Sequence, residues 1–96
     1  MGYVAFDGEY LNGEKNGKCK EYALDILIFE GEYLNVKKNG NCKEYDVQGK
    51  LKFEGEYLNG EKNGKCKEYH QGKLKFEGEY LNGKKMENVK NIIMDN

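Results

Sequence analysis

The chain has 96 residues, of which 34% are charged and 38% are hydrophobic, and its formal net charge is −1. This composition fits one small domain with little apolar surface to bury, and it lacks the basic surplus by which nucleic-acid binders displace counterions. Ser, Thr and Arg are absent, which excludes a hydroxyl nucleophile of the Ser or Thr type and an arginine fork for phosphate.

The chain begins MGYVAF, without the hydrophobic region of a signal peptide and with Phe6 where a myristoylation signal needs Ser or Thr. No apolar run approaches the ~18 residues of a membrane-spanning helix. We therefore expect a soluble cytoplasmic protein.

Four copies of one unit follow, each opened by a phenylalanine and continued by an acidic residue, Gly, Glu, Tyr, Leu and Asn. The opening residues, Phe6, Phe29, Phe53 and Phe76, are separated by 23, 24 and 23 residues. Such periods are typical of repeat architectures. We divide a single domain, residues 1–96, into units 6–28, 29–52, 53–75 and 76–93.

The first half of each unit alternates apolar and charged residues. In the third unit Leu51, Phe53, Gly55 and Tyr57 share one face, and residues 52, 54 and 56 share the other. This pattern predicts a half-buried strand with an aromatic face and a charged face. The glycine between two aromatics leaves backbone against which a ring can lie.

A turn and a second strand complete the unit. Asn59-Gly60 tolerates positive φ at both positions, whereas Asn35-Val36 breaks this pattern in the second unit. The following GKCKEY segment has Cys and Tyr three residues apart, so a bulge or bend is needed to place both on one face. The next turn contains Gly49 or Gly72, and the linker of residues 23–26 is the least regular.

Each unit is therefore predicted to be a β-hairpin. The fold class is all-β: an elongated single antiparallel sheet of about four tandem hairpins. On the charged face Glu54 and Glu56 are expected opposite Lys65 and Lys67, in a solvated ladder that helps fix the register. The segment from Met86 to Ile93 is interpreted as a degenerate final strand, with an amphipathic helix as the alternative.

The unit FEGEYLNGEKNGKCKEY resembles the MORN (membrane occupation and recognition nexus) repeat, an aromatic-x-Gly-x-aromatic strand followed by a turn and a Gly-x-Gly strand. Cys replaces the second glycine of that strand, and Tyr replaces the usual Trp. The Gly-x-Cys form is also similar to a variant found in antitoxin-like proteins. The resemblance implies a twisted sheet of hairpins used as a scaffold, sometimes at phosphoinositide-rich membranes, and it brings no catalytic residues.

The three cysteines, Cys19, Cys42 and Cys66, occupy one phase of the repeat. They should lie on alternate strands about 9.5 Å apart, too far for a disulfide. A zinc site would need clustered ligands, and a Cys66–His70 nucleophile–base pair would be an isolated coincidence. We interpret the thiols as small buried hydrophobes and expect no catalytic residue, metal or cofactor.

The aromatic face is the candidate partner-binding surface, since a single-layer sheet leaves part of its apolar face exposed. A self-packed groove is the alternative. The candidate residues of the partner-binding surface are Phe29, Tyr33, Phe53, Tyr57, Phe76 and Tyr80. The two open edges of the sheet could each accept a partner strand. Candidate contacts to anionic lipid head groups are Lys37, Lys38, Lys84 and Lys85, although nearby Glu residues weaken them.

Together these features predict a non-catalytic scaffold for protein–protein interaction or self-association. The alternatives are a peripheral phosphoinositide-binding module, located at a membrane, and an antitoxin-like partner protein. An enzyme is the least favoured class, because no acid, base and nucleophile converge in the sequence.

Overall fold

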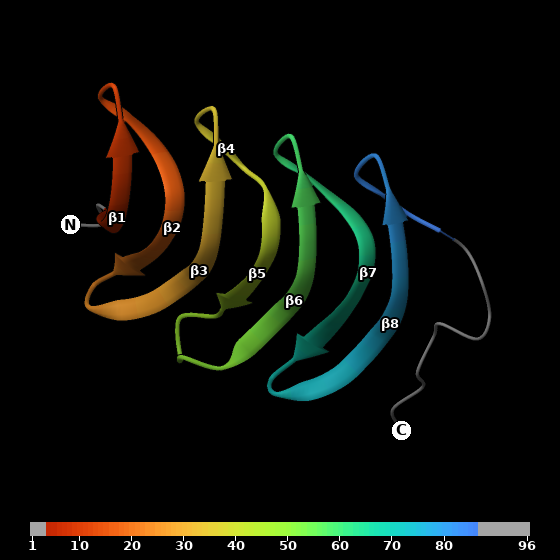
Figure 1. Cartoon of the computed structure of the whole chain (residues 1–96). Coiled ribbons are helices and arrows are strands. Elements are labelled where there is room, and N and C mark those ends of the chain that lie inside the picture. The colour runs from red at the N-terminus through yellow and green to blue at the C-terminus, as the bar shows by residue number, and fades with distance from the viewer. Residues whose placement is uncertain (1–3, 87–96) are drawn as a thin grey trace.

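A computed structural model describes residues 4–86 of the chain, and this part consists of strands joined by turns (Figure 1). The strands are β1 (Val4–Leu11), β2 (Glu14–Ala23), β3 (Ile26–Leu34), β4 (Lys37–Lys38), β5 (Gly40–Tyr45), β6 (Leu51–Leu58), β7 (Glu61–His70), β8 (Lys73–Leu81) and β9 (Lys84–Lys85). Within residues 4–86 there is no helix, and hence none that could span a membrane.

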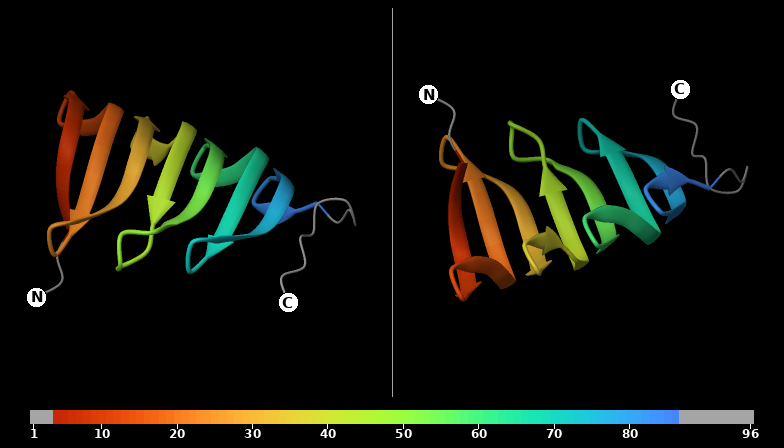
Figure 2. Two further views of the ribbon diagram at one scale, coloured as in Figure 1. Left: turned by 90° about the horizontal axis from the view of Figure 1, so that it is seen from below. Right: turned by 90° about the horizontal axis from the view of Figure 1, so that it is seen from above.

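All nine strands form one antiparallel sheet in meander order, β1-β2-β3-β5-β6-β7-β8-β9, with the short β4 also paired to β3. Figure 2 shows the hairpins side by side in one row, with β1 at one end and β8 and β9 at the other. The longest dimension of the molecule is 44 Å and the shortest is 18 Å. The prediction of an elongated single sheet built from hairpins is confirmed.

Six of the seven turns between consecutive paired strands are two-residue turns in which both residues have positive φ, as hairpins with right-handed twist favour. Asn35-Val36, which breaks the sequence pattern, keeps the same conformation, with φ of 53° and 70°. Leu24-Asp25, in the linker expected to be least regular, also keeps it. The conformation is therefore imposed by the strands on either side, even where the residue is not glycine.

The one longer turn lies between β5 and β6. There the Asp46 carboxylate accepts hydrogen bonds from the backbone N–H groups of Gln48 and Lys50, at 2.8 and 3.0 Å. These two hydrogen bonds lower the pKa of Asp46, and the bond from Lys50 has the larger effect. The irregular connection between units therefore falls after the second unit, and not after the first, where the sequence placed it.

The register shifts near the place where a bulge was expected in the second strand, but the extra residue lies in the strand paired with it. Along the β7–β8 pair, Glu68 lies opposite Phe76 and Tyr69 opposite Leu74, so the register shifts between Glu68 and Tyr69. Equivalent shifts occur after Glu21 and Glu44. The extra residue is Lys75 of β8, and β7 itself has none between Cys66 and Tyr69, so strand alternation keeps Cys66 and Glu68 on one face of the sheet.

The core lies on that face and is made of residues from every unit. Its buried members are Cys19, Phe29, Cys42, Phe53, Cys66 and Phe76, and Phe6 and the tyrosines at 33, 57 and 80 pack against it. Gly55 lies opposite Cys66. A Cβ added at Gly55 would lie 2.6 Å from the Cβ of Cys66 and 3.0 Å from Cζ of Phe53. Glycine is therefore required where the phenylalanine ring closes over the strand.

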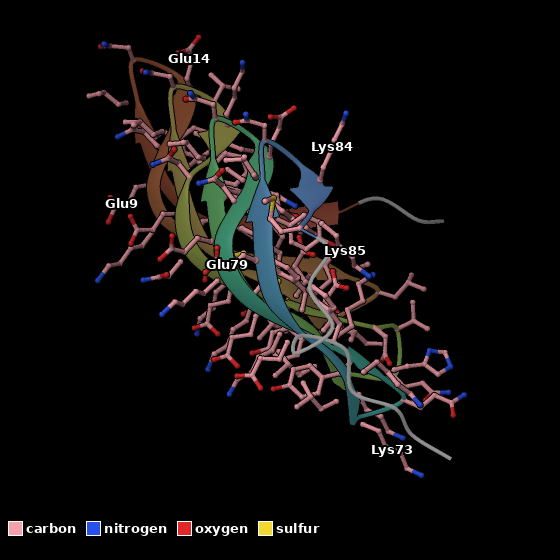
Figure 3. The ribbon with its side chains drawn as sticks, turned by 90° about the vertical axis from the view of Figure 1, so that its right-hand side faces the viewer. Glu9, Glu14, Lys73, Glu79, Lys84 and Lys85 are labelled. Atoms are coloured by element: carbon pink, nitrogen blue, oxygen red, sulfur yellow. The ribbon has the colours of Figure 1, made fainter. Side chains whose placement is uncertain are left out.

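The strands are strongly curved, and Figure 3 views this arc along the row of hairpins. Glu9 and Glu79 lie on its outer side, which we call the convex face, and Lys85 lies within the arc, on the concave face (Figure 3). By strand alternation the convex face carries the charged residues and the concave face carries the core. Of the predicted final strand, Met86 to Ile93, only Met86 is among the described residues.

Candidate functional site

The concave face holds all six predicted aromatic residues, but at two depths. The phenylalanines form its floor, with Phe29 and Phe53 2% exposed and Phe76 7% exposed. Tyr33, Tyr57 and Tyr80 are half-buried above them. Each tyrosine meets the phenylalanine of its own unit edge to face, with ring centroids 5.8–6.3 Å apart. The accessible part of the aromatic face therefore consists of tyrosine.

Each of these tyrosines donates a hydrogen bond to a glutamate of the preceding unit. The hydroxyl of Tyr57 lies 2.9 Å from Glu44, and the Nζ of Lys38 lies 3.4 Å from the same oxygen, Oε2. We call each such set of Lys, Glu and Tyr an inter-repeat triad. The three triads are Lys15–Glu21–Tyr33, Lys38–Glu44–Tyr57 and Lys62–Glu68–Tyr80.

The lysine of each triad also lies over aromatic rings of two successive units. Lys38 Nζ is 4.3 Å from the centroid of the Phe29 ring and 5.5 Å from that of Tyr57. Lys62 repeats this over Phe53 and Tyr80, at 4.3 and 5.4 Å. Cation–π contacts and a shared carboxylate thus hold the lysines against the concave face and couple neighbouring units.

Burial is the first cause that raises the pKa of Tyr33, Tyr57 and Tyr80, and the acceptor glutamate reinforces it. The pKa of Glu68 is lowered: burial opposes this, but the hydrogen bonds from Tyr80 and Lys85 and the charges of Lys62 and Lys85 outweigh it. The triads therefore combine a neutral phenol with a glutamate, which at Glu68 is held in its charged form.

The triad glutamates are functional candidates that the sequence analysis missed. Glu21 is the one buried charged residue of the described chain, and Glu44 and Glu68 are mostly buried. A signal was present, because two-residue alternation from Cys66 places Glu68 on the same face as the thiol. In the sequence analysis, charged residues were assigned only to the ladder on the other face.

The lysines predicted to meet lipid head groups divide into two pairs. Lys38 and Lys85 point into the concave face, where Lys85 Nζ lies 3.1 Å from Glu68 and 4.6 Å from the Phe76 ring centroid. Lys37 and Lys84 are exposed beside the turns. They alternate along the row of turns with Glu14 and Glu61, so the structure gathers no basic patch from the four.

A pocket of about 470 Å³ opens on the concave side beside the turn of residues 46–50. It is lined by Glu21, Phe29, Lys38, Glu44, Tyr45 and Val47, among others. Val47 lies at its rim and is 75% exposed. The pocket brings apolar carbon, two lysines and three carboxylates together at the boundary between units.

The convex face is charged, as predicted, but the register shift between Gly55 and Tyr57 leaves Glu56 without the expected partner Lys65. Glu54 lies opposite Lys67, and Lys65 and Lys67 lie opposite Glu79 and Glu77. A depression of about 800 Å³ runs over this face, and its floor is formed by the Gly–Cys pairs of successive units. Its lining includes five carboxylates and three lysines, so both signs of charge are present with an acidic excess.

The cysteines lie on β2, β5 and β7, with β3 or β6 between successive ones, and all three are free and buried. Burial raises the pKa of Cys42 to about 12 and of Cys19 and Cys66 to about 11, with help from the triad glutamates. His70 is exposed, and residues 4–86 contain no group of three or more metal-ligating side chains. The thiols therefore pack as small apolar groups.

Comparison with protein families gives a match to the MORN repeat at residues 6–23, 53–73 and 76–87, together more than half of the chain. The unmatched part contains Asn35-Val36, where the other units have Asn-Gly. No curated protein matches the chain.

Proposed function

Because the chain belongs to the MORN repeat family, whose members are repeat modules often in binding roles, we propose that it is a non-catalytic protein-interaction module. The observation that carries this proposal is the concave face itself. Within residues 4–86 the sheet is a single layer, and no other element covers the tyrosines, triads and pocket on this face.

The chemistry of the face fits a peptide segment better than a small ion. Tyrosines provide rigid contact area with a polar tip, as protein interfaces favour. The triads leave carboxylate and ammonium groups partly accessible at fixed intervals along the row of units. A partner with apolar side chains and alternating polar groups would match this arrangement. Strand addition at the β1 edge is a second route to the same function.

Affinity capture with paired variants tests the proposal. Val47→Glu places a charge at the rim of the concave pocket, and Lys67→Glu is the matched control on the convex face. Both residues are exposed, so both variants should fold. We expect a recurrent protein to be captured by the wild type and the Lys67→Glu variant and to be lost with Val47→Glu.

Binding to vesicles with and without phosphoinositide tests the membrane alternative. The interleaved Glu residues predict no phosphoinositide-dependent binding at physiological salt, since they offset the exposed Lys37 and Lys84. Binding that persists there, together with no captured protein, would replace the proposed function with the membrane alternative.

A further inference from the structure

A row of exposed leucines lies at the turn end of the convex face. It consists of the last residue of each first strand, Leu11, Leu34, Leu58 and Leu81, which are between 50% and 59% exposed. Equivalent positions in successive units are separated by two strand spacings, about 9.5 Å. We call these four residues the leucine row. A regular apolar line of this kind is unusual on the solvent side of a sheet that carries charges elsewhere.

Each leucine has a charged residue directly opposite it on the next strand. The register pairs Leu11 with Glu14, Leu34 with Lys37, Leu58 with Glu61 and Leu81 with Lys84. Glu14, Lys37, Glu61 and Lys84, which we call the charge row, are all exposed. Within the described residues none of the four makes an ion pair closer than 4 Å. Figure 3 shows Glu14 and Lys84 at the same end of the arc.

The signs along the charge row alternate: negative, positive, negative, positive. This order is self-complementary when the row is reversed. A two-fold axis parallel to the strands, between the second and third units, would place Glu14 opposite Lys84 of the second copy. The same axis would place Lys37 opposite Glu61 of the second copy, and the leucine rows would then meet each other.

From this pattern we propose that the turn end of the convex face is a dimer interface, and that its occupant is a second copy of the chain in antiparallel orientation. The interface is isologous, so all four charges are paired and no charge is left against a like charge. The leucine row and the charge row together form a narrow strip, and we expect a weak dimer near the low end of interface sizes. This proposal concerns the convex face and does not depend on the function proposed for the concave face.

Val36 fits the same arrangement. It is 48% exposed and lies in the turn next to Leu34, with φ of 70° where a β-branched residue is strained. The proposed axis places it over the turn at Gly60 of the second copy, a residue without a side chain, beside which the aliphatic part of that copy's Lys37 packs. A strained apolar residue at the centre of the strip is consistent with a contact made there.

Sedimentation equilibrium over a range of concentrations up to about 1 mM, the range of weak interfaces, tests the proposal. We expect a monomer–dimer equilibrium that weakens as salt rises. Leu34→Gln with Leu58→Gln should weaken the dimer by about tenfold or more, since the central leucines are lost. Circular dichroism checks that each variant folds.

Two charge swaps of identical composition give the decisive comparison. Lys37→Glu with Glu61→Lys keeps every pair opposite in sign across the axis, and should dimerise like the wild type. Glu14→Lys with Lys37→Glu has the same net charge but places like charges together at both pairs, and should dimerise at least about tenfold more weakly. A monomer at all concentrations, larger open-ended assemblies, or equal affinities for the two swaps would overturn the proposal.

Discussion

Val36 is the residue where sequence and backbone conformation disagree most. Its φ of 70° suits glycine, which occupies the same turn position in the other three units. We predict that Val36→Gly raises the free energy of unfolding by about 1–2 kcal/mol, because it removes backbone strain. Urea denaturation of the wild type and the variant measures this difference.

The reverse change at an equivalent turn is the control. Gly13 has φ of 80°, and no atom lies within 4 Å of a Cβ placed there, so Gly13→Val introduces the strain without a collision. It should lower the stability by a similar amount. Equal stability of wild type and Val36→Gly would show that the turn tolerates valine without cost.

Glu68 should give the stability a pH dependence in acid. Its pKa is lower in the folded chain than the ordinary value of 4.5, because hydrogen bonds from Tyr80 and Lys85 outweigh the opposing effect of burial. As the pH falls, the Glu68 carboxylate therefore binds a proton in the unfolded state at a higher pH than it does in the folded state. The stabilisation is complete above pH 4.5 and is lost as the pH drops through the folded-state pKa.

We predict that Glu68→Gln is less stable than the wild type at pH 7 and shows a shallower loss of stability below pH 4.5. Urea denaturation at a series of pH values measures the slope. Glu77→Gln makes the same charge change on the exposed convex face and should keep the wild-type slope. Parallel pH profiles for Glu68→Gln and the wild type would contradict the role given to the triad carboxylate.

At the scale of a single hairpin, the Gly–Cys pair is the tightest contact. A Cβ at Gly55 would meet the Cβ of Cys66 at 2.6 Å, the backbone oxygen of Lys65 at 3.0 Å and Phe53 at 3.0 Å. We predict that Gly55→Ala lowers the free energy of unfolding by about 1–3 kcal/mol, as overpacking does. Thermal or urea unfolding of the variant measures the loss.

A second substitution identifies the colliding group. Cys66→Gly removes the nearest atom but also a core side chain, so part of the stability lost by Gly55→Ala should be recovered when the double variant is compared with Cys66→Gly alone. The recovery should be partial, because Phe53 and the Lys65 oxygen remain. No recovery at all would locate the strain outside the Gly–Cys pair.

Between hairpins, the triads are the side-chain links. We predict that Tyr57→Phe and Glu44→Gln are coupled in a double-mutant cycle by about 0.5–3 kcal/mol, since the Tyr57 hydroxyl and the Glu44 carboxylate share a charge-assisted hydrogen bond. Chemical unfolding of the four proteins gives the coupling energy. Additive effects would mean that the units hold together without the triads.

Much of the element-scale architecture follows from local rules that a sequence displays. Alternation predicts the strands and Asn-Gly predicts the turns. The three-residue step from Cys66 to Tyr69 predicts a bulge in that strand, whereas the extra residue is Lys75 of the next one. The triads were missed because they depend on register between units. A lysine early in the second strand of a unit meets a glutamate further along that strand and a tyrosine of the next unit, and only the paired sheet brings these three together.

For the whole molecule, the sheet separates two surfaces with different character. The concave face contains the core, the triads and an open pocket, and the convex face contains paired charges with an apolar row at one end. The aromatic residues predicted for partner binding are all on the concave face, but burial limits contact to the tyrosines. The depth of the phenylalanines could not be predicted, because it results from the curvature of the sheet.

We propose that the concave face is the surface that binds a partner. Site-specific photo-crosslinking in cells can test this proposal, with the photoreactive side chain placed at Val47 on the concave side or at Lys67 on the convex side. We expect one recurrent protein adduct from position 47 and none of that protein from position 67. An adduct formed from position 67 alone, equally from both positions, or from neither would contradict it.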